Sequence, residues 1–413
     1  MIRRRTLLAA APAILTSGRS RAAETVKVGV MFPLTGNSAA SGGEGKAAVE
    51  VAADIINTGH PELKELTVGT TGGLPGLGGA KIEPIFVDHR GDPSMAQSLA
   101  LKLITSDKVS ALFGAYQSSA AMTATAVAER YGVPFVISDS VAANITSRGF
   151  KFTFRVTPIA SNFADSYMRF LLDQKKVGRR VEDIAIVNEN TDYGTSVGDA
   201  IAVQAQKVGL PVSLRIPYSA NGADVSAQVL QLKQKDPSVA MFVSYASDAI
   251  LFMRTMKTLD YLPPMIIGDS AGFSDPAFLP AAGGIAKGLV NRSVWNLGPP
   301  GSLSAGVNAI YKARTGNDIG DVSGRGIQAF FVLADALNRA GSTDPAKLRA
   351  ALAATALPHS AMVVGYRGVR FDETGQNVES ATYLTQLQGS GYVTIWPDDA
   401  AAAKVFWPMT GWR

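Results

Sequence analysis

The sequence predicts an α/β protein with two Rossmann-like lobes, each built on a parallel-type sheet covered by helices. Short apolar runs alternate with helix-length segments, which is the pattern of parallel strands joined by crossover helices. This alternation occurs twice along the 413 residues, with the extended segment FTFRVTP at 152–158 between the two series. A chain of this length with 46% hydrophobic residues can bury more than one core.

The first series opens with a buried-strand pattern at 25–32 and a helical pattern over 41–57. A second strand and helix are expected at 81–88 and 93–106. The glycine-rich stretch 58–80 between them predicts a loop. This loop matches neither GxxxxGK nor GxGxxG, so it does not indicate a nucleotide phosphate site.

The third unit of the first series places two polar loops side by side. Strands are expected at 109–114 and 133–138, around a helix that ends at Tyr131 before Gly132. Because the carboxyl ends of adjacent parallel strands form a crevice, the loops that follow them should hold a small polar molecule. The helix after the first loop should begin with a serine cap at Ser118 or Ser119. The candidate ligand-binding residues of the two loops are Gln117, Ser118, Ser119, Ser138, Asp139 and Ser140.

The second series repeats the strand and helix alternation. Its expected strands are 183–187, 212–217, 239–245 and 265–268, and its expected helices are 159–172, 194–208, 224–235 and 248–259. Farther along the chain, the patterns predict a strand within 288–297, a break at 298–301, helices over 327–340 and from 345, and a hairpin over 381–396.

The first 22 residues resemble a secretory signal of the twin-arginine type. Arginines at positions 3 to 5 precede a short apolar run and a small-residue cleavage site after Ala22. These residues hold five of the 39 basic residues and no acid, so the rest of the chain carries 34 of each sign. The basic excess therefore does not indicate nucleic-acid binding. The absence of cysteine excludes a lipoprotein anchor and fits an exported, periplasmic protein without disulfides.

Seven segments in order make the chain similar to periplasmic solute-binding proteins of ABC importers, of the branched-chain amino acid, amide and urea type. They are VGVMFPLTG, VDHRGDP, VPFVISDS, TSRGFKFTFRVTP, NENTDYGTS, LADALNRAGSTDP and FDETGQN. The resemblance covers essentially all residues after the signal. It implies two lobes joined by a three-crossing hinge, as in type I periplasmic binding proteins, that close on a small-molecule ligand without catalysing a reaction.

The resemblance also implies how the chain is divided and what it contacts. Lobe one would comprise 24–150 with 300–356, and lobe two 151–299 with 357–413. The protein would act as a monomer, need no cofactor or metal, and deliver its ligand to a membrane permease. A ligand-sensing role for a separate membrane receptor is the alternative with the same fold.

Further site residues follow from the resemblance. In this family the serine loops bind the polar end of the ligand, and Tyr193 and Tyr245 match positions that pack over it. Asp269 or Ser270 lies where amino-acid binders place an acid for the ammonium group. Ser41 occupies a position where several relatives have tyrosine, which favours a different or larger ligand. Arg325 lies near a further position that lines the family's cleft.

Asp139 departs from the pattern of relatives that bind amino acids, which have a small neutral residue there. A carboxylate at this position would repel the carboxylate of an amino acid. Either Asp139 turns away to cap a helix, or the ligand presents an amide, amine or hydroxyl group at that end.

Two segments of the sequence also match patterns of other functions. The GTSVG segment around Ser196, with His359 downstream, matches the nucleophile pattern of a serine hydrolase. However, Ser196 should lie in the first helical turn and not at the tight turn that the pattern requires. Asp88, His89 and Asp92 are neighbouring potential metal ligands, but a polar loop at a strand end is the preferred explanation for them.

Overall fold

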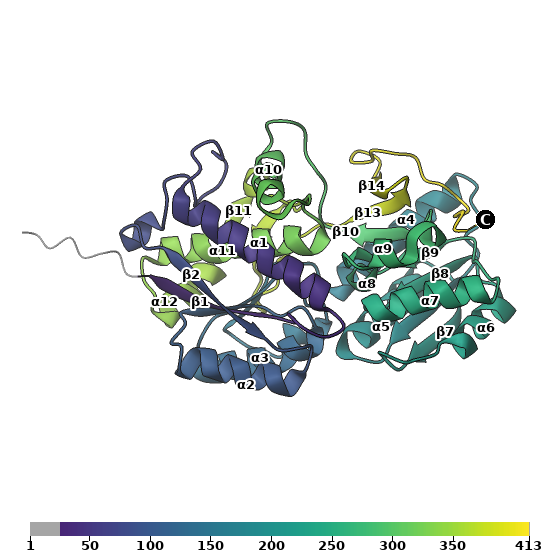
Figure 1. The fold of residues 1–413 in the computed structure, drawn as a ribbon, viewed down its shortest axis with the longest axis horizontal. Coiled ribbons are helices and arrows are strands. Elements are labelled where there is room, and N and C mark those ends of the chain that lie inside the picture. Colours follow the sequence, from purple (N-terminus) through teal and green to yellow (C-terminus); the bar gives the residue numbers. More distant parts are fainter. Residues whose placement is uncertain (1–24, 413) are drawn as a thin grey trace, which may run out of the picture.

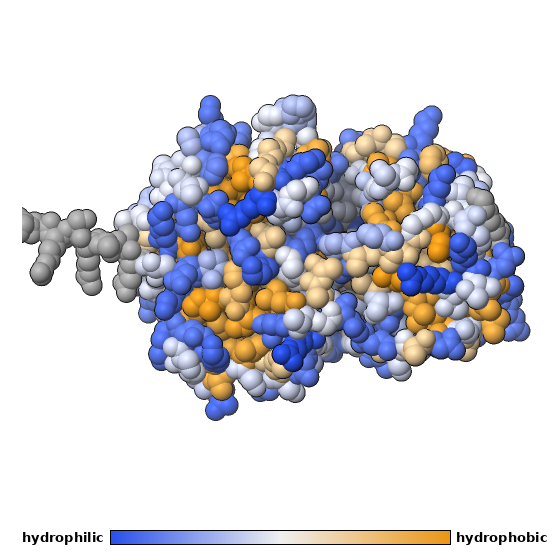
Figure 2. Space-filling view, viewed as in Figure 1, coloured by the Kyte–Doolittle hydropathy of each residue, from blue (hydrophilic) through white to orange (hydrophobic). Residues whose placement is uncertain are grey.

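The computed structural model describes residues 25–412 and shows two α/β lobes side by side (Figure 1). The predicted signal at 1–22 lies outside the described residues. Both lobes contain an open sheet flanked by helices, so the predicted α/β fold class is confirmed. Within 25–412, no helix has both the length and the apolar composition needed to cross a membrane. On the face shown in Figure 2, the apolar areas are separated by polar ones.

The sheet of the first lobe has five strands in the order β2-β1-β3-β4-β5, and all neighbours are parallel. Helices α2 and α3 cover one face, and α1 and α11 pack together over the other (Figure 1). The strands are β1 (Val26–Phe32), β2 (Ile82–Asp88), β3 (Ala111–Gly114), β4 (Phe135–Ile137) and β5 (Thr153–Arg155). The helices are α1 (Ala39–Thr58), α2 (Pro93–Thr105), α3 (Ser118–Tyr131), α10 (Leu303–Thr315), α11 (Asp321–Ala340) and α12 (Pro345–Ala353).

The sheet of the second lobe has seven strands in the order β14-β13-β10-β9-β8-β6-β7. It is parallel up to β10, and the C-terminal hairpin β13–β14 then adds two antiparallel strands. The strands are β6 (Ile184–Glu189), β7 (Val212–Tyr218), β8 (Val239–Val243), β9 (Ile266–Gly268), β10 (Val290–Ser293), β13 (Tyr383–Gln388) and β14 (Gly391–Trp396). The helices are α4 (Ala160–Lys176), α5 (Asp192–Lys207), α6 (Ser226–Lys235), α7 (Ala246–Thr258), α8 (Ala271–Ser274) and α9 (Phe278–Ala282).

Two regions between 298 and 370 differ from the sequence prediction. Helix α10 was not predicted, although Ser302 caps it by accepting a hydrogen bond from the Ala305 N–H. Helix α11 begins at Asp321, six residues earlier than expected. Its first two turns are buried, but they contain glycines and polar residues and lack the apolar stripe from which a helix is predicted. Gly326, for example, packs against Ala48 of α1. Strands β11 (Ala356–Pro358) and β12 (Gly368–Arg370) form a small antiparallel pair that was also missed.

The buried side chains show where the chain passes from one lobe to the other. Val156 and Val294 belong to the core of the first lobe, whereas Ala160 and Val290 belong to that of the second. The chain crosses a third time between Phe371, in the core of the first lobe, and Leu384, in the core of the second. Residues 153–156 and 361–371 therefore pack with the first lobe, although the predicted boundaries assigned 151–299 and everything after 356 to the second.

Gly42 and Gly43 of α1 provide a matched test of how tightly this helix packs. A Cβ on Gly42 would lie 2.0 Å from the carbonyl oxygen of Pro33, whereas a Cβ on Gly43 would have nothing within 4 Å. We expect Gly42→Ala to destabilise the protein by about 2–3 kcal/mol, because the backbone after β1 must move. Gly43→Ala should stabilise it by about 0.5–1 kcal/mol, since alanine favours the helix. Chemical denaturation of both variants measures the difference, and equal effects would contradict the described approach of α1 to β1.

Candidate functional site

The polar loops after β3 and β4 lie together at the boundary between the lobes. The Ser140 hydroxyl donates to the carbonyl oxygen of Ala115 at 2.6 Å, and the Ser118 hydroxyl accepts from the Ala142 N–H at 3.3 Å. Ser118, Ser138, Asp139 and Ser140 are all buried. The predicted pairing of the two loops at the carboxyl ends of adjacent strands is therefore present in the structure.

The start of α3 differs in detail from the prediction. Gln117 occupies the N-cap position without a side-chain cap, and Ser118 is the first helical residue. The hydroxyl of Ser118 faces the neighbouring loop, so the predicted serine cap is wrong for this residue. Ser119 is partly exposed in the first helical turn and does not cap the helix either.

Three tyrosine rings connect the lobes beside these loops. Tyr245, at the end of β8, lies 5.9 Å from the ring of Tyr116 in the first lobe and 5.1 Å from Tyr193 in the second, between ring centroids. The Tyr193 hydroxyl donates to a carboxylate oxygen of Asp269 at 2.8 Å. Both predicted tyrosines therefore lie at the lobe boundary with the serine loops, and Tyr116 adds a ring that the sequence analysis did not single out.

A chain of five buried charged residues crosses the boundary, and we call it the interlobe charge network. In the second lobe, Arg292 donates to Asp269 at 2.9 Å, and both side chains are 1% exposed. In the first lobe, Arg325 lies 3.5 Å from Asp139 and donates to Asp321 at 2.7 Å. Asp321 joins the two halves, because its carboxylate also lies 3.9 Å from Arg292.

The net charge of the network is negative. Burial disfavours the charge of Asp321, but Arg325 and Arg292 outweigh this effect and hold the pKa of its carboxyl below the usual value. Burial raises the pKa of Asp139, because the charge of Arg325 and the hydrogen bond from Ser138 offset it only in part. With all five groups ionised, three carboxylates oppose two guanidinium groups, which leaves a net charge of −1.

Several hydrogen bonds hold the lobes together around the network. Ser41, fully buried in α1, donates to Asp275 of the second lobe at 2.5 Å. Ser270 donates to Asp321 at 2.5 Å and has a φ of 43°, a conformation that is costly for a residue with a Cβ. Asn37 donates to Asn221 at 2.6 Å on the exposed rim. The two lobes are thus in a closed arrangement in which each supplies donors and acceptors to the other.

Three buried atoms at the site have no hydrogen-bond partner among the described residues. They are the Oδ1 atom of Asp139, the Oε1 atom of Gln117 and the Nη1 atom of Arg292. Buried polar atoms are nearly always satisfied by protein, ordered water or ligand. Two acceptors and one donor are therefore left over at the boundary where the predicted site residues meet.

The structure places most predicted site residues together, but it assigns Asp269 and Asp139 to ion pairs. Asp269 accepts from Tyr167, Tyr193 and Arg292, so its carboxylate is already occupied. Asp139 does not cap a helix: it accepts from Ser138 and faces Arg325. The sequence analysis missed Arg292 and Asp321, and the available signal was a charged residue inside the apolar segment GLVNRSVW and an acid at a helix start.

The residues of the two rival functions have structural roles. Ser196 lies in the second turn of α5, and its hydroxyl accepts from the Ala143 N–H at 3.0 Å across the lobe boundary. It therefore does not sit at a strand-to-helix elbow. Asp88 accepts from the Leu34 and Arg90 N–H groups, and Asp92 caps α2. Among residues 25–412, no group of three potential ligands is placed to hold a metal ion.

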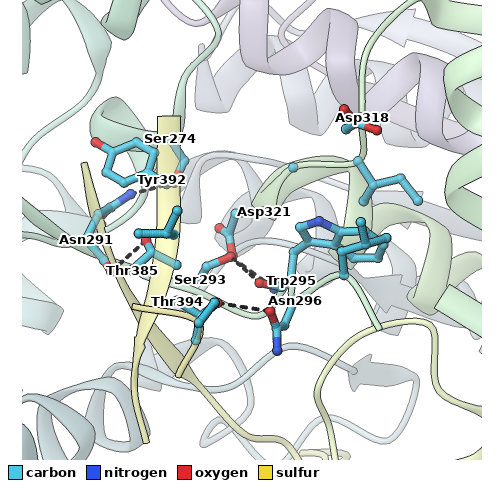
Figure 3. Close-up of a pocket in the computed structure, with 15 residues that line it drawn as sticks. Ser274, Asn291, Ser293, Trp295, Asn296, Asp318, Asp321, Thr385, Tyr392 and Thr394 are labelled. Carbon is cyan, nitrogen blue, oxygen red and sulfur yellow. Dashed lines mark hydrogen bonds between the residues drawn. The ribbon is translucent and has the colours of Figure 1, made fainter. Parts of the chain in front are cut away.

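A cavity of about 470 Å³ adjoins the network at the second crossing between the lobes (Figure 3). We call it the hinge-side cavity. One wall comes from β10, β13 and β14 of the second lobe, and includes Asn291, Thr385 and Tyr392. The opposite wall contains the indole of Trp295, and Asp321 lies between the two walls.

The chain belongs to the periplasmic binding protein family, whose model matches residues 25–392. It is 30% identical over 408 residues to "Leu/Ile/Val-binding protein homolog 8" of Brucella suis biovar 1, which covers 95% of this chain and 96% of the relative. The chain therefore belongs to the periplasmic binding proteins that include the Leu/Ile/Val-binding protein homologues.

Solved structures share the fold at lower identity. The branched-chain amino acid binding protein LivJ of Streptococcus pneumoniae, solved with isoleucine, has a TM-score of 0.76 at 20% identity and covers 93% of this chain and 100% of its own. A solute-binding protein of Rhodopseudomonas palustris BisB5, solved with 3,4-dihydroxybenzoic acid, has a TM-score of 0.73 at 21% identity and covers 94% and 98%. Their fold is that of type I periplasmic binding proteins, as predicted.

Glu44 of α1 makes the stability of this region dependent on pH. Its carboxylate accepts from the N–H and the hydroxyl of Ser323 at the start of α11. Burial, reinforced by the charges of Asp321 and Asp139, raises its pKa from 4.5 to about 7. The folded protein therefore favours the protonated form, and the stability that this preference contributes is lost as the pH rises from 4.5 to about 7.

We expect Glu44→Gln to remove this pH dependence. The stability of the variant relative to the wild type should increase by about 1–2 kcal/mol between pH 5 and pH 8, measured by chemical denaturation. Glu50→Gln on the same helix, where the glutamate is partly exposed and paired with Lys46, is the control and should show little change. A constant difference between wild type and Glu44→Gln at both pH values would contradict the assignment.

Proposed function

We propose that this protein is the extracytoplasmic solute-binding component of an ABC importer, which binds a small polar organic ligand between its lobes. The observation that carries the proposal is that both lobes contribute buried charges and tyrosine rings to one boundary. The interlobe charge network, the loops at Ser118 and Ser140, and the ring of Tyr245 all meet there. A ligand that contacts both lobes favours the closed form, because only that form provides both sets of contacts.

The unpartnered atoms at the boundary support a ligand that both donates and accepts hydrogen bonds. Oδ1 of Asp139 lies 3.5 Å from Arg325, and Nη1 of Arg292 lies 3.9 Å from Asp321, but neither atom makes a hydrogen bond. A donor and an acceptor on the ligand would complete them. An amino acid, an amide or a related compound carries both kinds of group. The net charge of the network favours a ligand with no net negative charge, since a further buried anion would raise the electrostatic cost.

Export and delivery complete the proposal. The signal pattern in residues 1–22 supports a periplasmic location, and the names of the relatives support a role in import. On this view the closed protein, as a monomer, is recognised by the membrane permease, and no reaction is catalysed. The serine of the hydrolase-like segment serves as an acceptor between the lobes, which is a structural role.

A ligand screen with a matched pair of tyrosine variants tests the proposal. A compound that binds the closed form raises the melting temperature, and small nitrogenous and carboxylated metabolites are the compounds to screen. For any compound found, we expect Tyr245→Ala to weaken binding about tenfold or more by calorimetry, because an aromatic wall of the site is lost. Tyr131→Ala, at the exposed end of α3, should leave the dissociation constant within about twofold.

Small-angle scattering adds an independent measurement. The ligand should make the protein more compact or leave it in the closed arrangement, and it should not expand it. If no metabolite raised the melting temperature, or if Tyr245→Ala and Tyr131→Ala behaved alike, the site between the lobes would not be the binding site.

A further inference from the structure

The hinge-side cavity lies outside the group of residues that the sequence analysis predicted, yet it is connected to them. Ser270, a predicted site residue, donates through its N–H to Asn291 at 2.8 Å and through its hydroxyl to Asp321 at 2.5 Å. Both partners line the cavity. Ser270 therefore connects the wall of the cavity to the predicted site residues by two hydrogen bonds.

The cavity is lined by both lobes, as a ligand site between lobes requires. The second lobe contributes Asn291 and Tyr392, and the first contributes Ile319 and Asp321 at the start of α11. Trp295 belongs to the segment that joins them. Because the lining comes from separate rigid bodies, the shape of the cavity must change when the lobes open.

The polar atoms on the cavity walls are mostly satisfied by one another. Asn291 donates to Ser274 at 2.8 Å, Thr394 donates to Asn296 at 3.0 Å, and Ser293 accepts from the Trp295 N–H (Figure 3). An occupant consequently does not have to satisfy many buried groups. Its affinity would come from the aromatic faces and from the charge of the lining.

The charge of the lining is negative. Asp318 and Asp321 line the cavity, whereas no lysine, arginine or histidine does so. The cations that pair with these acids are not part of the lining: Lys312 contacts Asp318 at 2.9 Å, and Arg325 contacts Asp321 at 2.7 Å. An anion in the cavity would thus meet carboxylates without a cation of its own, whereas an organic cation would lie against the indole of Trp295 and near Asp318. The oxygens of Asp321 already accept hydrogen bonds from Val294, Ser270 and Arg325, so this carboxylate contributes only its field.

We propose that the hinge-side cavity is a subsite for a cationic nitrogen group of the ligand, such as an ammonium or amidinium group on a flat or compact body. This inference rests on the proposed function and makes it narrower. It predicts that the chain prefers nitrogenous ligands over carboxylic acids of the same shape.

Three probes of equal shape and different charge test the preference. Benzamidine, benzamide and benzoate carry a positive, a zero and a negative charge on the same ring at neutral pH. We expect benzamidine to bind the wild-type protein with a dissociation constant on the order of 1 mM or lower, by calorimetry. Benzamide should bind about threefold to tenfold more weakly, and benzoate more weakly still. Benzoate binding as tightly as benzamidine, or no binding of benzamidine, would overturn the proposal.

Two aspartate variants locate the benzamidine site. The side chains of Asp318 and Asp54 are 57% and 44% exposed and pair with cations of α10, at 2.9 Å to Lys312 and 3.2 Å to Arg314. Only Asp318 lines the cavity. Asp318→Asn should weaken benzamidine binding about fivefold, whereas Asp54→Asn should leave it within about 1.5-fold. Equal responses of the two variants would place the cation elsewhere and refute the proposal.

A tryptophan variant tests the aromatic contribution. Trp295→Leu retains an apolar side chain but removes the face of the ring. We expect it to weaken the binding of benzamidine by about threefold to tenfold and the binding of benzamide by less. An equal loss for the two probes would show that the ring does not contact the charge. If a metabolite from the screen depended on Tyr245 while none of the three probes responded to Asp318→Asn, the proposed function would hold and only this subsite would be wrong.

Discussion

The carboxylate of Asp321 must be paired, because an isolated charge in a protein interior costs several kcal/mol. Its partners come from three places: Arg325 on the same helix, Ser270 on the second lobe, and the Val294 N–H where the chain crosses back to the first lobe. Arg292 approaches from the second sheet at 3.9 Å. One residue at the start of α11 therefore sets how the two lobes meet, and the binding boundary depends on its position.

The same requirement links stability to binding. The two buried arginines, Arg292 and Arg325, face three buried carboxylates. Oδ1 of Asp139 consequently accepts no hydrogen bond at the boundary. A buried pair of this kind contributes little stability by itself, but it defines a geometry that a wrong partner cannot satisfy. On the proposed function, the network would restrict the choice of ligand more than it stabilises the fold.

The fold is shared with proteins that were solved with chemically different ligands, an aliphatic amino acid in one case and a phenolic acid in another. The sheets and crossings provide the hinge, whereas the side chains at the boundary decide what is held. Ser41 illustrates this difference. It is a buried serine that donates to Asp275 and joins the lobes.

The sequence alone determined the order of strands and helices through residue 268, because periodicity and glycine stops are local signals. It also predicted that the loops at Ser118 and Ser140 lie together, since the carboxyl ends of neighbouring parallel strands lie at the same edge of a sheet. It did not reveal α10, the early start of α11, or the pairing of Asp321 with Arg292. These features depend on contacts between residues far apart in the chain, such as Gly326 against Ala48, and the charge partners of a buried acid are decided only when separate elements pack.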